Sequence, residues 1–240
     1  MISIVTGATS GIGRAIALSL ATKGYCIATL SRRHDQLDKL RSDLDRLNAG
    51  RKNLLLRGDL RNPEDIGLFH NKLRDEFGIP DLIVNCAGIY VAGFPSETTA
   101  QMLMEQIQTN FLSAFSITSP WINDLKKRNT GAIISIGSIV THEPRTEACA
   151  YTLSKNLLDD WMAMLADELK PFRIGICRIA PESVLTPSWD NEPEEKKKGI
   201  MMPEEIANTL MELMLMPYAN WPEEIVMRVP NKNTDSHGKA

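Results

Sequence analysis

The chain is poor in cysteine and has no long apolar run. Only four of its 240 residues are cysteines, and none stands in a C-x-x-C pair. They are Cys26, Cys86, Cys149 and Cys177. Such scattered cysteines argue against a metal site or a disulfide framework, so we expect free thiols in the cytoplasm. Because no apolar run approaches the ~20 residues that span a bilayer, and a strand-like segment starts at residue 2, we expect neither a membrane partner nor a signal peptide.

A strong charge of one sign is also missing. The formal net charge is −3, which argues against nucleic acid as the main partner. Hydrophobic residues make up 43% of the chain and charged residues 24%, as in a soluble globular protein. The length is sufficient for one α/β domain with a large core.

Glycines cluster near the start of the chain, in Thr6-Gly7-Ala8-Thr9-Ser10-Gly11-Ile12-Gly13. An apolar segment precedes this stretch and an amphipathic one follows it, which predicts a strand, a glycine turn and a helix. Unpaired N–H groups and the helix dipole make such a turn a phosphate site. Gly7 would allow the tight turn, Gly11 the approach of a pyrophosphate, and Gly13 close packing of the helix on the strand. The alternative is a loop that merely needs positive φ.

Apolar and amphipathic segments alternate along the rest of the chain. Strands are expected at 2–5, 25–30, 53–57, 81–84, 131–136, 173–179 and 224–229. Helices are expected at 14–23, 37–47, 62–77, 100–127, 150–170 and 203–216, with Pro120 as a kink in the longest. This order predicts an α/β protein: a three-layer α-β-α Rossmann fold with a doubly wound, parallel, seven-stranded sheet. We expect one domain over residues 1–230 and a disordered tail over 231–240.

Ligands of such sheets bind at the carboxyl ends of the strands. The residues that follow the predicted strands are therefore candidates for one shared crevice. They are the glycine loop, Ser31 to Arg33, Asp59 and Leu60, Asn85 to Gly88, Ser138, and Pro181 to Thr186. Within the polar, irregular segment 180–202, the charged run from Glu194 to Lys198 is expected to be the solvated rim of a mobile lid.

Several of these motifs resemble the short-chain dehydrogenase/reductase family, in the family's order and over nearly the whole chain. The loop T-G-x-x-x-G-x-G has the family's form, and Asn85-Cys86-Ala87-Gly88 is similar to its N-N-A-G motif, with a cysteine replacing the second asparagine. Ser138 ends a predicted strand thirteen residues before Tyr151. Tyr151 and Lys155 are four residues apart and share one helix face.

The resemblance implies a catalytic tetrad of Asn110, Ser138, Tyr151 and Lys155. Carbonyl reduction leaves an alkoxide that needs a proton and a stabilising donor. Tyr151 is the expected proton donor, and a neighbouring Lys155 ammonium would favour its phenolate. Ser138 would polarise the carbonyl, and Asn110 would place a water that links Lys155 to solvent. The alternative is that these residues have no catalytic role. A Y-x-x-x-K pair alone is typical of a solvated helix face, and an asparagine in the middle of a helix is typical of a polar surface position.

The family also implies which residues bind a nicotinamide cofactor. Asp59 would hold the adenine amino group, unless it is only a helix cap. Lys155 would bind the ribose, while Asn85 is expected to be mostly structural. The full expected set is Gly7, Thr9, Ser10, Gly11, Ile12, Gly13, Ser31, Arg32, Arg33, Asp59, Leu60, Asn85, Ala87, Gly88, Tyr151, Lys155, Pro181, Val184 and Thr186.

The end of the second predicted strand indicates which nicotinamide cofactor is used. An NAD-preferring relative has an acidic residue there, which accepts hydrogen bonds from the ribose 2′-hydroxyl. Here Ser31 takes that place, and the guanidinium groups of Arg32 and Arg33 can bind a phosphate. We therefore expect NADP(H), with NAD(H) as the alternative. Ser10 counts against this slightly, since many NADP-using relatives have a basic residue there.

One motif departs from the family pattern. P-G-x-V-x-T is replaced by Pro181-Glu182-Ser183-Val184-Leu185-Thr186. If the glycine needs positive φ, Glu182 is strained or the turn differs. Nearby, His142, Glu143 and Arg145 are either substrate contacts or solvated loop charges.

The expected function is an oxidoreductase that interconverts a carbonyl and a secondary alcohol, such as a 3-oxoacyl, small hydroxy-acid or ketone reductase. The competing interpretation is a non-catalytic regulator that binds the same nucleotide. The helices over 100–127 and 150–170 carry more apolar residues than one buried stripe requires, including Met102, Phe115, Trp161 and Met164. In the family these helices pair across a two-fold axis, so we expect a homodimer or homotetramer.

Overall fold

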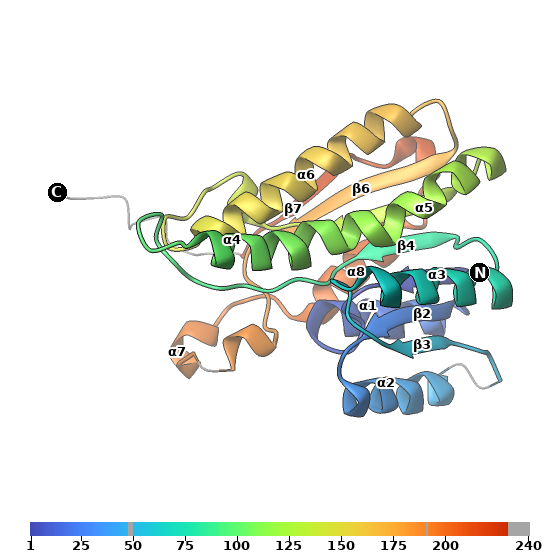
Figure 1. Ribbon diagram of the computed structural model, residues 1–240, viewed down its shortest axis with the longest axis horizontal. Helices are drawn as coiled ribbons and strands as arrows, with labels where there is room; N and C mark the ends of the chain where they lie inside the picture. The colour runs from blue at the N-terminus through green and yellow to red at the C-terminus, as the bar shows by residue number, and fades with distance from the viewer. Residues whose placement is uncertain (48–49, 191, 230–240) are drawn as a thin grey trace.

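A parallel seven-stranded sheet forms the centre of the computed structural model, which describes residues 1–47, 50–190 and 192–229 (Figure 1). Its strand order is β3-β2-β1-β4-β5-β6-β7, the doubly wound arrangement that the sequence predicts. The strands are β1 Ile2–Val5, β2 Cys26–Ser31, β3 Leu54–Arg57, β4 Leu82–Asn85, β5 Gly131–Ile136, β6 Ile174–Pro181 and β7 Glu224–Met227. The strand order reverses between β1 and β4, which places the site at their carboxyl ends.

Helices cover both faces of this sheet. One face packs against α1 (Gly11–Thr22), α2 (His34–Leu47) and α8 (Pro203–Leu213). The other packs against α3 (Pro63–Glu76), α5 (Ser113–Arg128) and α6 (Cys149–Leu169). Neighbouring strand residues enter opposite cores: Ile133 joins the α3/α5/α6 side and Ile134 the α1/α8 side. Because successive side chains of a strand point to opposite faces, a sheet covered on both sides needs strands that are apolar throughout. No helix in the described part of the chain is long and apolar enough to cross a membrane.

The long helix predicted over 100–127 is not continuous. It consists of α4 (Ala100–Ile107), a π-helical turn over Gln108–Leu112 and α5, while Pro120 lies inside α5. The π-helical turn carries Asn110, which is completely buried. Such turns widen a helix locally and often occur at functional sites. The break therefore falls at the predicted catalytic asparagine rather than at the proline.

The segment after β6 carries the charged run, in which Glu194, Glu195, Lys196 and Lys198 are exposed, and it also contains regular structure. It contains a 3-10 turn over Pro187–Trp189, the short helix α7 (Glu194–Lys197) and a bridge between Val184 and Met201. Glu182 is not strained, because Asn129 is the one non-glycine residue with positive φ among the described residues. Its backbone N–H donates to Met227 O at 2.9 Å, and its carboxylate accepts from Val229 N at 3.1 Å. The turn thus differs from one that requires glycine. The predicted tail, 231–240, lies outside the described residues.

Candidate active site

The glycine loop joins β1 to the start of α1. Gly7 and Gly11 have φ values of 70° and 50°, where glycine is favoured. A Cβ at Gly13 would lie 2.4 Å from the carbonyl oxygen of Gly7, so only glycine lets the helix approach this closely. Ser10 is the N-cap residue of α1, yet its side chain makes no capping hydrogen bond. The backbone N–H groups at this helix end therefore remain open to an anion.

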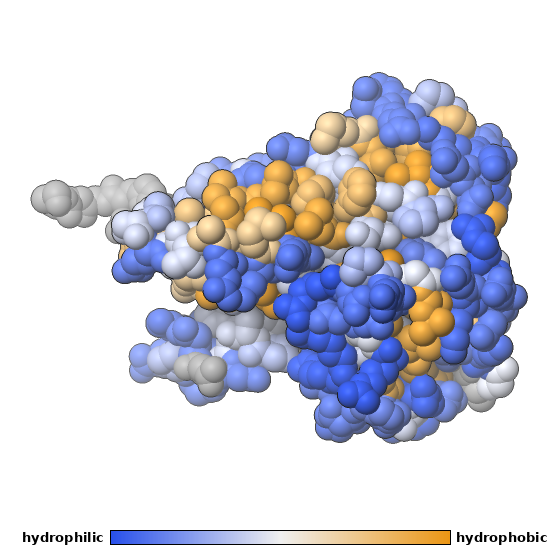
Figure 2. Space-filling model, in the orientation of Figure 1, coloured by the Kyte–Doolittle hydropathy of each residue, from blue (hydrophilic) through white to orange (hydrophobic). Residues whose placement is uncertain are grey.

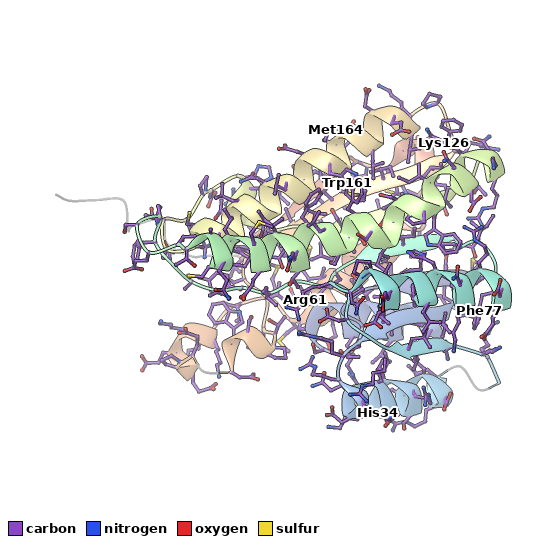
Figure 3. All side chains as sticks on the ribbon, viewed as in Figure 1. His34, Arg61, Phe77, Lys126, Trp161 and Met164 are labelled. Atoms are coloured by element: carbon purple, nitrogen blue, oxygen red, sulfur yellow. The ribbon has the colours of Figure 1, made fainter. Side chains whose placement is uncertain are left out.

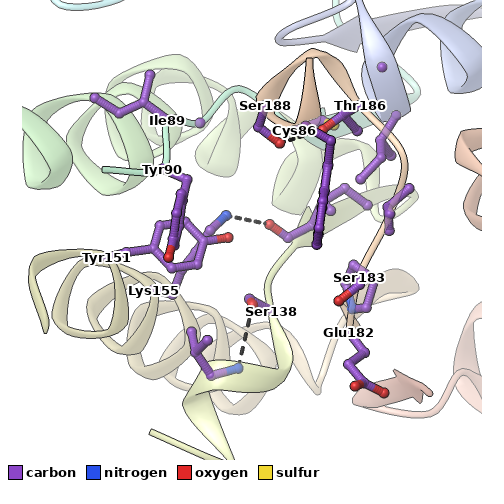
Figure 4. A pocket seen from close by; sticks show the side chains of 18 of the residues that line it. Cys86, Ile89, Tyr90, Ser138, Tyr151, Lys155, Glu182, Ser183, Thr186 and Ser188 are labelled. Atoms are coloured by element: carbon purple, nitrogen blue, oxygen red, sulfur yellow. Dashed lines mark hydrogen bonds between the residues drawn. The ribbon is translucent and has the colours of Figure 1, made fainter. Parts of the chain in front are cut away.

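A pocket of about 590 Å³ opens between this loop and the ends of β4, β5 and β6 (Figure 4). Many of the predicted site residues line it: Gly7, Ser10, Gly11, Ile12, Gly13, Ala87, Gly88, Ser138, Tyr151, Lys155, Pro181, Val184 and Thr186. The others lie outside its lining: Thr9, Ser31, Arg32, Arg33, Asp59, Leu60, Asn85 and Asn110. The structure thus brings the loop and three of the four predicted catalytic residues together in one cavity.

Ser138, Tyr151 and Lys155 share one wall of this pocket (Figure 4). Tyr151 and Lys155 are one turn apart on α6, and the Lys155 Nζ lies 5.8 Å from the centroid of the Tyr151 ring. Lys155 is only 4% exposed, and its ammonium group donates to the Ile136 carbonyl at 2.8 Å. Ser138 follows β5 directly and is buried, and its Oγ accepts from Val140 N at 3.4 Å. A hydroxyl, a phenol and an ammonium group therefore converge where a carbonyl could be bound.

The fourth predicted catalytic residue, Asn110, supports this wall from behind. Its Oδ1 accepts from Ile89 N at 2.7 Å, and its Nδ2 donates to Ile89 O at 3.0 Å and to Ser154 Oγ at 2.9 Å. Ser154 Oγ in turn donates to Tyr151 O at 2.8 Å. The side chain of Asn110 thus ties the loop after β4 to the helix that carries Tyr151. Its placement of a water stays a prediction.

The sequence analysis missed Tyr90, which lines the pocket, and Gln106, which supports the loop that carries it. The ring of Tyr90 packs edge-on against Tyr151, with centroids 5.2 Å apart. Gln106 is completely buried and pairs with both backbone groups of Val91, at 3.3 and 3.2 Å. Gln106 precedes Asn110 by one helical turn, so two buried amides hold the loop that presents Tyr90. Their i, i+4 spacing was the one signal in the sequence that pointed to this clamp.

Cys86, where the family has a second asparagine, also lines the pocket. Burial raises the pKa of its thiol to about 12, although the nearby Lys155 ammonium opposes this. Such a thiol stays protonated near neutral pH and is no nucleophile. All four cysteines are free thiols.

The residues expected around the adenosine half of a cofactor gather at the ends of β2 and β3. Arg33 donates to Ser10 Oγ at 3.2 Å, across the glycine loop, and Thr9 Oγ1 lies 3.4 Å from Ser31 Oγ. Arg32 is within 4.0 Å of Asp59. These contacts join the start of α1 to the end of β2, as the common crevice requires.

Asp59 has a closer partner than expected. Its carboxylate accepts from Arg61 at 2.7 and 3.1 Å, and this hydrogen bonding holds the pKa of Asp59 below its ordinary value. Its adenine contact stays a prediction, as does that of Leu60. Asn85 donates to Thr118 Oγ1 at 2.9 Å, which fits the structural role expected of it.

The charged loop residues near the pocket divide into two groups. His142 pairs with Glu224 at 2.9 Å and Glu143 with Arg228 at 2.7 Å, away from the pocket. Arg145 lines the pocket instead. So do Glu192 and Lys196, which form an ion pair at 2.8 Å.

Together, the open helix N-terminus at a switch point of a doubly wound sheet and the adjoining polar pocket define a nucleotide-binding Rossmann protein. The sequence profile of short chain dehydrogenases matches residues 1–197, so the chain belongs to this family of oxidoreductases.

Similar proteins agree with this assignment. The 3-oxoacyl-[acyl-carrier-protein] reductase of Escherichia coli is 30% identical, over 83% of this chain and 80% of the relative. The sepiapterin reductase of Chlorobaculum tepidum is 26% identical, over 95% of both chains. The structure of an alcohol dehydrogenase from Thermococcus sibiricus, complexed with 5-hydroxy-NADP, superposes with a TM-score of 0.84. It is 25% identical, over 95% of this chain and 96% of that protein.

Proposed function

We propose that the protein is an NADP(H)-dependent oxidoreductase that interconverts a carbonyl and a secondary alcohol. The observation that carries this proposal is the position of Ser138, Tyr151 and Lys155 on one wall of the pocket into which the glycine loop opens. A regulator that only binds a nucleotide would need the loop but not this wall.

The residues present fit a dinucleotide. The uncapped start of α1 would bind the pyrophosphate, and Lys155 would bind the nicotinamide ribose. When bound, the cofactor supplies or accepts the hydride. The Ser138 hydroxyl would donate a hydrogen bond to the carbonyl oxygen, and Tyr151 would transfer its phenolic proton to that oxygen as negative charge develops. The Lys155 ammonium, 5.8 Å from the phenol ring, would favour the phenolate that remains.

The preference for NADP(H) is supported by the contacts at the end of β2. Arg33 reaches Ser10, and Arg32 flanks the same opening beside Asp59. Ser31 brings no negative charge to this place, so a 2′-phosphate would meet two guanidinium groups and two hydroxyls. The T. sibiricus structure was solved with an NADP derivative, which is consistent with this choice.

The protein is further proposed to be a cytoplasmic homodimer or homotetramer. Apolar side chains gather over α4, α5 and α6 on the face shown in Figure 2. Phe115 is 42% and Met164 64% exposed, whereas Trp161 is buried. Figure 3 shows Met164 on the outer side of α6 and Trp161 on the side that faces α5. An exposed apolar face of this kind is typical of an interface between subunits.

The experiment that tests the function is a substrate panel. NADPH consumption is followed with 3-oxoacyl thioesters, small 2-oxo and 3-oxo acids, and neutral ketones. The first class is that of the E. coli relative, and all three are expected from the sequence. We expect turnover with at least one class and none with Tyr151→Phe. Binding of NADPH without turnover on any carbonyl would favour the regulator instead.

A further inference from the structure

A buried carboxyl group lies behind the proposed catalytic wall. Asp159 is four residues after Lys155 and eight after Tyr151 on α6, so the three side chains share one helix face. Asp159 is only 6% exposed, and its Oδ1 forms no hydrogen bond with any described residue. A buried carboxyl group without full hydrogen bonding is costly and calls for an explanation.

The same carboxyl group touches the backbone that presents Ser138. A Cβ at Gly137 would lie 3.1 Å from Asp159 Oδ1, so this oxygen rests against the peptide just before the serine. Gly137 N also donates to Ile179 O at 2.7 Å, which fixes this turn against β6. Asp159 therefore shares a helix face with Lys155 and lies against the peptide that precedes Ser138, without lining the pocket.

Charged and polar groups face Asp159 from every neighbouring element. They are Lys155 on its own helix, Thr141 after β5, Arg178 on β6 and Glu224 on β7, which is paired with His142. Burial raises the pKa of Asp159, while the Thr141 hydroxyl and the Arg178 and Lys155 cations oppose this.

We propose that Asp159 is a positioning residue that acts through Lys155: its carboxylate offsets part of the ammonium's field and thereby sets the pH at which Tyr151 can exchange its proton. The proposal rests on the proposed function of Tyr151 and Lys155. The sign follows from Coulomb's law. An ionised Asp159 repels the developing phenolate and so moves alcohol oxidation, which needs the phenolate, to higher pH. Removing this charge should move the profile to lower pH.

The magnitude follows from the spacing along the helix. Charges two turns apart, roughly 12 Å, at an effective dielectric of ~20, shift a neighbouring ionisation by about one unit. We therefore expect the midpoint of the alcohol-oxidation profile of Asp159→Asn to lie about 1 pH unit lower. A purely structural role would lower the rate at all pH values and leave the midpoint where it is.

The test compares wild type, Asp159→Asn and Asp160→Asn. Asp160 is the adjacent, exposed residue of α6, so it controls for the loss of one negative charge. Circular dichroism checks the fold, and if Asp159→Asn is insoluble, Asp159→Ser leaves room for a water. Two readouts are used: the pH dependence of kcat/KM for alcohol oxidation, and tyrosinate absorbance without substrate, with Tyr151→Phe as the blank.

A downward shift of both midpoints in the Asp159 variant, absent in Asp160→Asn, supports the proposal. Equal midpoints in all three proteins, or an equal shift in both variants, overturn it. If no carbonyl or alcohol is turned over, the proposed function has failed. The absorbance titration still tests the link between Asp159 and Tyr151 in that case, so the two failures are distinguishable.

Discussion

The two ends of the crevice differ in how their polar groups are held. At the reaction end, Lys155 and Asn110 are buried and hydrogen-bonded to backbone carbonyls and amides. At the adenosine end, the Arg32 side chain is 61% exposed and its nearest carboxylate oxygen is 4.0 Å away. Interactions between buried groups act in a low dielectric, whereas exposed charges are weakened by water and salt.

Under the proposed function, this difference separates two tasks. The reaction end must hold a few groups in one geometry while charge develops on an oxygen, which requires preorganised donors. The adenosine end must only recognise a phosphate, for which flexible guanidinium groups suffice. Changes at the reaction end should therefore reduce turnover strongly, and changes at the adenosine end should reduce cofactor use moderately.

The largest effect is expected from Tyr151→Phe. Loss of a general acid typically costs at least about a hundredfold in turnover. Since the ring and its packing against Tyr90 remain, the variant should fold and bind NADPH as the wild type does. Steady-state kinetics measures kcat, and fluorescence titration measures the Kd for NADPH. Near-normal turnover would contradict the expectation that changes at the reaction end reduce turnover strongly.

The same contrast explains how far the sequence predicted the molecule. The fold followed from apolar strands and amphipathic helices, because a sheet covered on both faces leaves a plain local pattern. The prediction of Ser138, Tyr151 and Lys155 rests on spacing that is local or fixed by one strand and one helix. The placement of these three residues on one pocket wall agrees with that expectation.

What the sequence could not supply are pairings between distant segments. The i, i+4 spacing of Gln106 and Asn110 does not show that the Gln106 amide binds the backbone of Val91, nor that a π-helical turn at Asn110 interrupts the long helix. The sequence likewise does not show that Arg61, two residues after Asp59, binds both oxygens of its carboxylate. Asp59 is therefore not a free carboxylate. Such contacts depend on tertiary packing, which overrides local preference.

At the adenosine end, we expect a smaller effect from Arg32→Ala and from Arg33→Ala. Each should lower kcat/KM for NADPH by about tenfold, or about 1.4 kcal/mol, and leave kcat/KM for NADH nearly unchanged. Arg33 contacts Ser10 on the glycine loop, so its loss should be at least as large as that of Arg32. Kinetics with both cofactors at two salt concentrations measures this.

The matched control is Arg41→Ala, which removes an exposed arginine of α2 whose partner is Asp38. It should leave both cofactors unaffected. Equal use of NADPH and NADH by the wild type would contradict the prediction, and Ser31→Asp should then change nothing. Otherwise Ser31→Asp should move the preference toward NADH by placing a carboxylate beside the 2′-position.

Helix α6 also has a buried face and an exposed apolar face. A charge placed on the exposed apolar face is expected to change the assembly of the protein. Phe115→Lys and Met164→Lys place a charge on the exposed apolar face of α5 and α6, where burial of an unpaired charge would oppose association. We expect either change to shift the protein toward monomers in light scattering at micromolar concentration. Leu68→Lys, at an exposed position of α3, is the control and should not change the mass. A monomeric wild type would refute the proposed assembly.

The smallest effect is expected at Cys86, which tests whether the reaction end excludes water and charge. Because burial raises the pKa of this thiol to about 12, a far smaller share of Cys86 than of a free cysteine is ionised at pH 8. Iodoacetamide should therefore label Cys86 far more slowly than a small free thiol, as mass spectrometry of the digested protein would measure. The labelling rate should rise about tenfold per pH unit through the alkaline range, because the thiolate is the nucleophile.

Cys86→Ala should keep activity within about threefold, since a neutral thiol supplies no charge to the reaction. Rapid labelling at neutral pH would instead mean that the Lys155 ammonium outweighs burial at this position, and that the reaction end is wetter than its buried side chains indicate.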